Sequence, residues 1–357
     1  MDLAAVDAVI REGIEEGAAP GACYAIGCRG EVAIRSFGRF TYAPDSPAVM
    51  PETIWDLASL TKVIGTTTAA MLLYEEGRLP LDRPVADILP SFGKPHVTLR
   101  NLLLHNSGLA ASHPNSTAFT DREALLASIF SQELAYETGS DVIYSDLGFI
   151  VLGCALEALS GMPLDAILDT RVWQPLGMRD TGFHPAERDR CAPTETPEPW
   201  RLHLRRLRGA EDRREWIQGE VHDPTALVLG GIAGHAGLFS TASDLATFMT
   251  ALPSLVSPST LDLFTTPAAG SRALGWDTPS EGSSAGSLLG PGSYGHTGFT
   301  GTSVWANQNF FAILLTNRVH PTATNQRIRD LRIRFIDAAW HATASSRGDR
   351  RGFLRPG

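Results

Sequence analysis

The stretch "IWDLASLTKVIGTTTAAML", residues 54–72, is apolar apart from small hydroxyl side chains, one acid and one lysine. Its spacing predicts a helix that begins near Ser59 and continues to about Glu76. The lysine, Lys62, follows Ser59 by three residues, and Lys94 is the only other lysine in the chain. Because burying an unpaired charge is costly, a lysine at the start of an apolar helix needs a physical reason.

The spacing of Ser59 and Lys62 suggests nucleophilic catalysis. A serine hydroxyl is a poor nucleophile at neutral pH unless a base lies within hydrogen-bond reach. On a helix these two residues are i and i+3, so they share one face. Burial lowers the pKa of a lysine, and Lys62 is therefore predicted to take the Ser59 proton. The pair alone also fits a helix-start serine beside a lysine that extends to solvent.

Two other short segments have chemistry of the same kind. Tyr144 precedes the predicted helix "SDLGFIVLGCALEAL", residues 145–159, where its side chain can point into a cleft and a cation would favour its phenolate. His296-Thr297-Gly298 is predicted to lie on a late strand. Gly298 lets a ligand approach the backbone, and strand N–H groups can bind an oxyanion there.

Composition excludes several classes of function. The 357 residues are 43% hydrophobic and 19% charged, and the net charge of −9 argues against nucleic acid or an anionic membrane as partner. No run of 18 apolar residues predicts a membrane span, and acidic and basic residues interrupt the N-terminal segment, which is not typical of a signal peptide. We therefore expect a cytoplasmic protein, or a periplasmic or secreted one if a leader was removed.

No pair of the four cysteines has metal-ligand spacing. Cys23 and Cys28 are expected on opposite faces of one strand, and all four cysteines, which include Cys154 and Cys191, are expected to be buried thiols. The sequence therefore predicts no metal site and no cofactor.

Predicted strands lie near both ends of the chain, at 22–40 and 303–317, with helices mainly between them. This order predicts an α/β protein of the α+β type. An antiparallel sheet with flanking terminal helices would form a discontinuous domain from residues 1–77 and 241–345, and a mainly helical domain, 78–240, would be inserted into it. Residues 190–224 are expected to form a long loop or lid, and 346–357 a frayed tail.

The three segments, in this order, resemble the motifs of the serine β-lactamase and penicillin-binding protein superfamily. Within it, the chain is most similar to the group of class C β-lactamases, D-alanyl-D-alanine carboxypeptidases and family VIII carboxylesterases. The resemblance spans residues 10–340. Supporting matches are "LLLHNSGL" (102–109), "GGIAGHAGLFSTASDLATFM" (230–249) and "ALGW" (273–276). It implies a β-lactamase/transpeptidase-like fold.

The resemblance also implies roles for particular residues. Ser59 would be the acylated nucleophile, Lys62 its proton acceptor, and Tyr144 the group that passes a proton to or from the leaving group or the deacylating water. The backbone N–H groups of Ser59 and Phe299 would form the oxyanion hole. The residues expected to contact the substrate are Asp146, His296, Thr297 and Gly298.

Two positions depart from the family pattern. Asp146 stands where the family usually has asparagine, and its carboxylate could hold Lys62 charged, which would favour Tyr144 as the working base. His296 stands where a lysine is common. Because histidine carries a charge only below about its pKa, the affinity for a carboxylate-bearing substrate is expected to fall between pH 6 and 8. This version of the motif resembles some DD-peptidases and esterases more than typical β-lactamases.

The expected function is a cofactor-free serine hydrolase that acts through an acyl-enzyme on small esters or D-amino-acid peptides and amides. The alternatives are a peptidoglycan DD-carboxypeptidase with weak β-lactamase activity and a catalytically silent binding protein. A Ser-His-Asp triad built on His222 and Asp223, and a nucleophile elbow at Ser303, are rival sites. The expected partner is a small-molecule or peptide substrate, and the sequence leaves the oligomeric state open.

Overall fold

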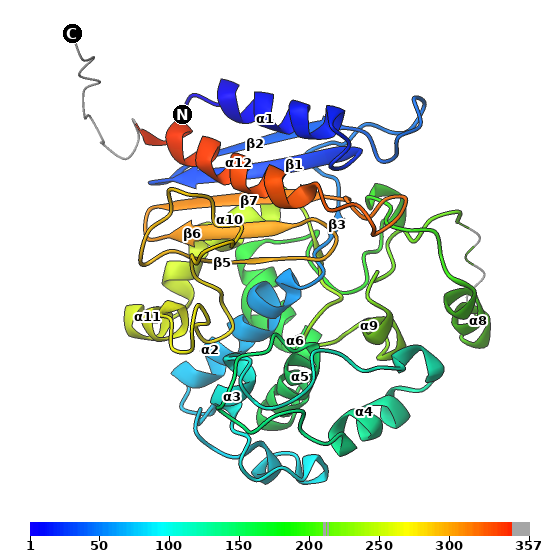
Figure 1. Cartoon of the computed structure of the whole chain (residues 1–357), viewed down its shortest axis with the longest axis vertical. Helices are drawn as coiled ribbons and strands as arrows, with labels where there is room; N and C mark the ends of the chain where they lie inside the picture. The colour runs from blue at the N-terminus through cyan, green and yellow to red at the C-terminus, as the bar shows by residue number, and fades with distance from the viewer. Residues whose placement is uncertain (210–211, 213, 345–357) are drawn as a thin grey trace.

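The structure, a computed structural model, describes residues 1–209, 212 and 214–344. A five-stranded antiparallel sheet in the order β2-β1-β7-β6-β5 lies at its centre (Figure 1). Its strands are β1 (Gly21–Cys28), β2 (Glu31–Gly38), β5 (Tyr294–Thr297), β6 (Ser303–Asn307) and β7 (Phe310–Thr316). The expected frayed tail lies outside the described residues.

Strand β1 joins the two ends of the chain. It pairs with β2 through a tight turn at Arg29-Gly30, where both residues have positive φ, as a two-residue hairpin turn requires. On its other side β1 pairs with β7, with Ala22 opposite Thr316. The expectation of one sheet built from both ends of the chain is therefore confirmed.

Helices α1 (Ala4–Glu15) and α12 (Ile328–Ala342) cover one face of the sheet (Figure 1). Alternation along β1 sends Tyr24 and Ile26 into the cluster beneath these helices, and Cys23 into the larger core on the opposite face. Arg334 of α12 forms ion pairs with Glu12 of α1 and with Glu16, which directly follows α1. The terminal helices therefore form one layer, as the sequence predicted.

The opposite face of the sheet carries α10 (Ala242–Leu255), which contacts β1 and β7, and below it lie the remaining helices (Figure 1). A two-stranded ribbon, β3 (Trp55–Asp56) with β4 (Phe239–Ser240), links the two regions. The other helices are α2 (Thr68–Glu75), α3 (Leu99–Leu103), α4 (Arg122–Ser131), α5 (Asp146–Ser160), α6 (Leu164–Leu168), α7 (Gln174–Leu176), α8 (Pro199–Leu207), α9 (Pro224–Val228) and α11 (Pro258–Thr265). No single helix among the described residues is long and apolar enough to cross a membrane.

The expectation of a long loop at 190–224 was wrong in part, because this segment contains α8. Pro199 occupies the first helical turn, where its missing N–H costs nothing. Arg201 and Arg205 face inward and share the carboxylate of Glu220. The buried face of this short helix carries two arginines beside Leu204, and the many Pro, Arg and Glu residues around it obscure its apolar spacing in the sequence.

Two glycines bring α5 against the loop that precedes β4. Gly153 of α5 and Gly234 of the loop approach each other closely, and a Cβ atom on Gly234 would collide with the Phe149 carbonyl oxygen. The Gly234 carbonyl oxygen also accepts a hydrogen bond of 2.6 Å from the Thr66 hydroxyl. The loop is therefore held between α5 and the segment that follows Ser59.

Gly234→Ala is expected to destabilise the protein by about 1–3 kcal/mol, because the methyl group would be forced into the backbone of α5. The midpoint of thermal unfolding, measured by calorimetry, should fall by several degrees. Gly182→Ala is the matched control, since nothing lies within 4 Å of its Cβ position and its φ is not in the left-handed region. An equal effect of the two substitutions would contradict this close approach.

Candidate active site

Ser59 lies on a strained turn between β3 and the first buried helix. Ala58, immediately before it, has a φ of +46°, and its N–H donates to Asp56 Oδ1 at 2.8 Å. The chain then continues as a π-helical segment, Thr61–Thr67, that leads into α2. Positive φ at a non-glycine residue and π-helical turns are both concentrated at functional sites. Ser59 remains partly accessible to solvent.

Three acceptors surround the buried amine of Lys62. Its Nζ donates to Ser59 Oγ at 3.1 Å, to Asp146 Oδ1 at 2.7 Å and to the His235 carbonyl oxygen at 3.0 Å. An ammonium group has three donors and no acceptor, so this set of partners fits the charged form.

Charge at Asp146 reverses the pKa shift that the sequence suggested for Lys62. Burial lowers the pKa of Lys62, but the Asp146 carboxylate and the Tyr144 oxygen oppose it, and the net pKa lies above its ordinary value. The expectation that burial alone lowers the pKa of Lys62, and so leaves its amine neutral, is therefore wrong. Lys62 is a fixed cation beside Ser59, and Asp146, which was expected to contact the substrate, is its ion-pair partner.

Tyr144 is held by the start of α5. Ser145 caps that helix by accepting the Gly148 N–H, and its own N–H donates to Nδ1 of His105, whose ring centroid lies 4.7 Å from that of Tyr144. The Tyr144 hydroxyl interacts electrostatically with both Lys62 and Ser59. Burial raises the pKa of Tyr144, Lys62 lowers it, and the net pKa is raised, so the resting side chain is a neutral phenol.

The loop after β5 abuts the Ser59 turn. Thr302 and Thr300 donate their hydroxyl hydrogens to the Leu57 and Asp56 carbonyl oxygens. A Cβ atom on Gly298 would collide with the same Leu57 carbonyl, which explains the glycine. The backbone N–H groups of Ser59 and Phe299 donate to no acceptor in the described part of the chain. Both amides are thus available to stabilise an oxyanion.

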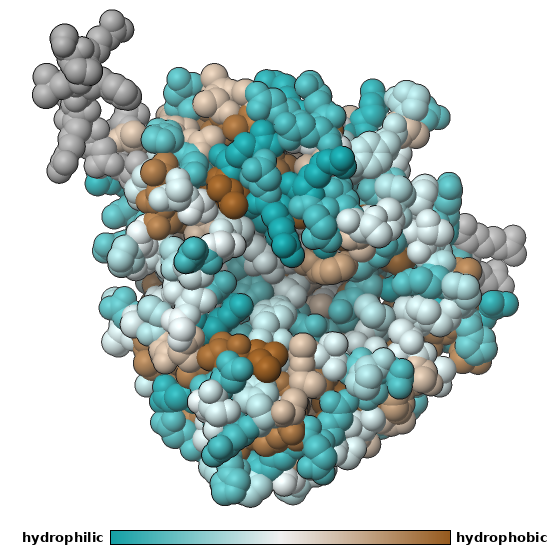
Figure 2. Space-filling view, viewed as in Figure 1, coloured by the Kyte–Doolittle hydropathy of each residue, from teal (hydrophilic) through white to brown (hydrophobic). Residues whose placement is uncertain are grey.

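A cavity of about 450 Å³ opens above Ser59. Figure 2 shows a hollow across this face of the molecule, below α12. Among the residues predicted from sequence, those that line the cavity are Ser59, Tyr144, His296, Thr297, Gly298 and Phe299. The structure therefore brings these six residues together, with Lys62 and Asp146 directly behind Ser59.

His296 has a different electrostatic character from the one expected. It is buried, its Nδ1 lies 2.8 Å from the Thr297 carbonyl oxygen, and burial with the nearby charges of Arg272 and Lys62 holds its pKa well below the usual range. This lowered pKa favours the neutral imidazole, which argues against the expected binding of a carboxylate through the charge of His296.

Neither rival site forms. Ser303 is fully buried in β6. His222 Nε2 lies 2.7 Å from a carboxylate oxygen of Glu195, and Asp223 instead contacts His235 at 2.9 Å. None of these side chains contacts Ser59 in the described structure.

Sequence reasoning missed several contributors to the site. Asp56 holds the Ser59 turn, and the His235 carbonyl completes the shell around Lys62. Arg272 lines the cavity, and its guanidinium lies 5.4 Å from the Tyr144 ring centroid. Arg272 directly precedes the "ALGW" match, and this proximity was the only available signal for it.

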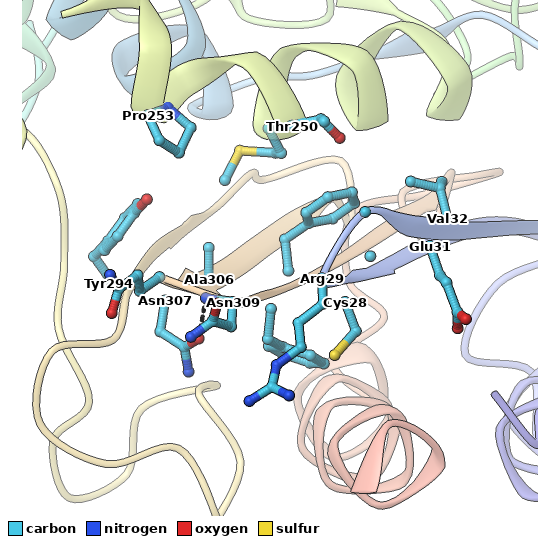
Figure 3. Close-up of a pocket in the computed structure, with 16 residues that line it drawn as sticks. Cys28, Arg29, Glu31, Val32, Thr250, Pro253, Tyr294, Ala306, Asn307 and Asn309 are labelled. Atoms are coloured by element: carbon cyan, nitrogen blue, oxygen red, sulfur yellow. Dashed lines mark hydrogen bonds between the residues drawn. The ribbon is translucent and has the colours of Figure 1, made fainter. Parts of the chain in front are cut away.

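A second, smaller cavity of about 120 Å³ lies between α10 and the β1–β2 and β6–β7 turns (Figure 3). Its wall includes Arg29, Tyr294 and Asn307. None of the residues predicted to be catalytic lines it, so the Ser59 cavity is the candidate active site.

Comparison with known proteins agrees with this geometry. A family model described as Beta-lactamase matches residues 6–335. The chain is 33% identical to an N-acetylmuramyl-L-alanine amidase of Bacillus subtilis over 77% of its length and 70% of the relative's. It is 31% identical to a putative D-alanyl-D-alanine carboxypeptidase of Escherichia coli, over 77% and 71%. A penicillin-binding protein homologue from Caulobacter crescentus shares the fold, with a TM-score of 0.74 at 22% identity over 95% of this chain and 97% of that chain.

Asp146→Asn should lower the pKa of Lys62, because burial would then act without an opposing carboxylate. The inflection of kcat/KM at alkaline pH should move to lower pH by about one unit or more, measured with a neutral p-nitrophenyl ester from pH 6 to 10.5. Coincident profiles for Asp146→Asn and the wild type would show that the carboxylate does not control the charge of Lys62.

Because His296 stays neutral, KM for an N-acyl-D-Ala-D-Ala substrate should change less than about twofold between pH 6 and pH 8. The measurement is KM at pH 6, 7 and 8, with a neutral p-nitrophenyl ester as the control substrate. A several-fold rise confined to the charged substrate would mean that His296 titrates and reads the carboxylate.

Proposed function

The chain is a serine hydrolase of the beta-lactamase family, and we propose that it cleaves small esters or D-amino-acid amides and peptides through an acyl-enzyme on Ser59. One observation carries the proposal. An accessible Ser59 hydroxyl accepts a hydrogen bond from the Lys62 ammonium and shares its cavity with the Tyr144 side chain, beside two backbone amides that have no acceptor among the described residues.

In acylation, Ser59 Oγ forms a bond to the substrate carbonyl carbon. The Ser59 proton passes to the Tyr144 oxygen, while the proton of Tyr144 passes to the nitrogen or oxygen of the leaving group as its bond to the carbonyl carbon breaks. The charge that develops on the carbonyl oxygen is stabilised by the N–H groups of Ser59 and Phe299. This relay requires neither a neutral lysine nor a free phenolate at rest, and it agrees with the raised pKa of both side chains.

Lys62 has an electrostatic role in this scheme. Its ammonium lies 3.1 Å from Ser59 Oγ, where it stabilises negative charge on that oxygen during attack. It also favours transient negative charge on the Tyr144 oxygen. Asp146 keeps Lys62 protonated, and so keeps this stabilisation constant across neutral pH.

Deacylation reverses the proton route. A water molecule attacks the acyl carbon, its proton passes to Tyr144, and the Tyr144 proton returns to Ser59 Oγ as the ester bond breaks. Atoms and charge balance without a cofactor. The names of the relatives, an amidase and a putative carboxypeptidase, support an amide substrate, whereas the neutral cavity wall at His296 also admits an ester.

Ser59→Ala is expected to abolish covalent labelling by a fluorophosphonate probe, because no other described serine shares this environment. Intact-mass and peptide mass spectrometry of the wild type should place the adduct on Ser59. Ser280→Ala, in an exposed loop, is the matched control and should label fully. An adduct on another residue would reject Ser59, and absence of labelling in the wild type would favour a silent binding protein on this fold.

A further inference from the structure

Arg272 lies in the catalytic cavity, and the proposed proton relay does not use it. Its guanidinium carbon lies over the Tyr144 ring, 5.4 Å from the centroid, and its side chain is 20% exposed. The Lys62 amine lies over the same ring, at 4.8 Å. Both distances are within the range of about 6 Å in which a cation is attracted to an aromatic face. Two cations therefore act on one phenol ring.

The loop that carries Arg272 is fixed at two places. Asp277 and Gly295 of β5 exchange two backbone hydrogen bonds, of 2.9 Å and 2.8 Å, which attach the loop to the sheet. The Gly275 N–H donates to the Leu103 carbonyl oxygen at 2.9 Å, which attaches the loop to the end of α3. The backbone around Arg272 is therefore held by both the sheet and the helical region.

Asp277 also orients the Arg272 side chain. One oxygen of its carboxylate lies 3.6 Å from Nη1 of Arg272. The other oxygen accepts hydrogen bonds from the Ser271 hydroxyl at 2.7 Å and from the Thr278 N–H at 3.1 Å. Because two donors hold this carboxylate in place, it keeps the guanidinium close to the Tyr144 ring.

The two imidazoles beside Tyr144 do not share this positive charge. The ring centroids of His105 and His296 lie 4.7 Å and 5.8 Å from that of Tyr144. Both histidines are buried, and burial together with the charges of Arg272 and Lys62 holds the pKa of each well below its usual range. The neutral imidazole is favoured in both, so the positive charge close to the Tyr144 ring comes from Arg272 and Lys62.

A cation over the Tyr144 ring has its largest effect when the phenol loses its proton. Negative charge on a phenolate spreads from the oxygen into the ring, so the cation is attracted to the phenolate more strongly than to the phenol. Burial and the Asp146 carboxylate oppose this effect, because both raise the pKa of Tyr144. In the proposed relay, the Tyr144 oxygen gains negative charge whenever its own proton leaves before the Ser59 proton arrives. Arginine suits this role, since its charge persists at every physiological pH.

We propose that Arg272 is a positioning residue that acts through Tyr144, and that its guanidinium stabilises the negative charge that Tyr144 carries during the proton relay. Arg272 neither gains nor loses a proton in this step, and it forms no bond to the reacting atoms. Asp277 holds it in place. This inference rests on the proposed function for the moment at which the charge develops, but the effect of Arg272 on the ionisation of Tyr144 can be measured without turnover.

The first measurement uses the Ser59→Ala protein, in which turnover does not interfere. Tyr144 is replaced by 3-fluorotyrosine, and ionisation of its phenol is followed by fluorine-19 NMR as the pH is raised. The pKa of this phenol should rise by about half a unit or more in Arg272→Gln, because a cation is removed. It should fall in Asp277→Asn, because an opposing anion is removed. A purely structural role of the loop would not produce shifts of opposite sign.

The second measurement is turnover of a neutral p-nitrophenyl ester, which has no carboxylate that an arginine could bind. Since acylation and deacylation both use Tyr144, Arg272→Gln should lower kcat about three- to tenfold, while KM changes less than about twofold. Arg272→Lys keeps the charge and should recover most of the loss. Arg11→Gln is the matched control and should leave kcat unchanged, because Arg11 of α1 lies over the Phe37 ring at 5.1 Å, outside the cavity.

An unchanged phenol pKa or an unchanged kcat in Arg272→Gln would overturn the inference, and so would a loss confined to KM, which would place Arg272 on the substrate instead. Equal losses in Arg272→Gln and Arg272→Lys, or in Arg272→Gln and Arg11→Gln, would also overturn it. If the phenol pKa shifts as expected but the wild type neither cleaves the ester nor reacts with fluorophosphonate, the coupling of Arg272 to Tyr144 stands and the proposed hydrolase fails.

Discussion

The ion pair between Lys62 and Asp146 is the interaction on which the site depends. It joins the segment after Ser59 to the first residue of α5, and the same ammonium also holds the Ser59 hydroxyl and the His235 carbonyl. Three separate parts of the chain are thereby arranged around one nitrogen atom. Removing the Asp146 carboxylate would leave the buried Lys62 cation with only neutral acceptors. The charge of Asp146 therefore influences both the position of the Lys62 amine and its protonation.

Close backbone contacts at two glycines also hold the elements of the site together. Gly298 allows the loop after β5 to touch the Ser59 turn, and Gly234 allows the loop before β4 to touch α5. The first contact joins the five-stranded sheet to the Ser59 turn, and the second joins two parts of the helical region, so the nucleophile, the tyrosine and the oxyanion donors are held by elements that pack on one another. Ser59, Tyr144 and Phe299 therefore line one cavity in this structure.

The charges of the cavity are distributed in an unusual way for its motifs. His296, a buried histidine whose pKa is lowered, stands where the family often has a lysine. The positive charge of the cavity lies instead on Arg318, which follows β7, and on Arg329 and Arg332 of α12. Arginine keeps its charge at every physiological pH and donates in a planar fork suited to carboxylates. Recognition of an anion by these groups would therefore be independent of pH in the range where histidine titrates.

The sequence by itself determined the features that depend on local spacing. The i, i+3 relation of Ser59 and Lys62, the strands near both ends of the chain and the helix after Tyr144 follow from periodicity and from residue type, and the family motifs indicated which segments belong together. The structure places the six predicted cavity residues around one space. Helix α8 was missed because its buried face carries Arg201 and Arg205, which are stabilised by a distant glutamate.

The protonation of the site was decided only by the tertiary structure. Lys62 meets Asp146 across 84 residues of chain, and His296 is buried near Arg272, so their pKa values depend on neighbours that sequence spacing does not reveal.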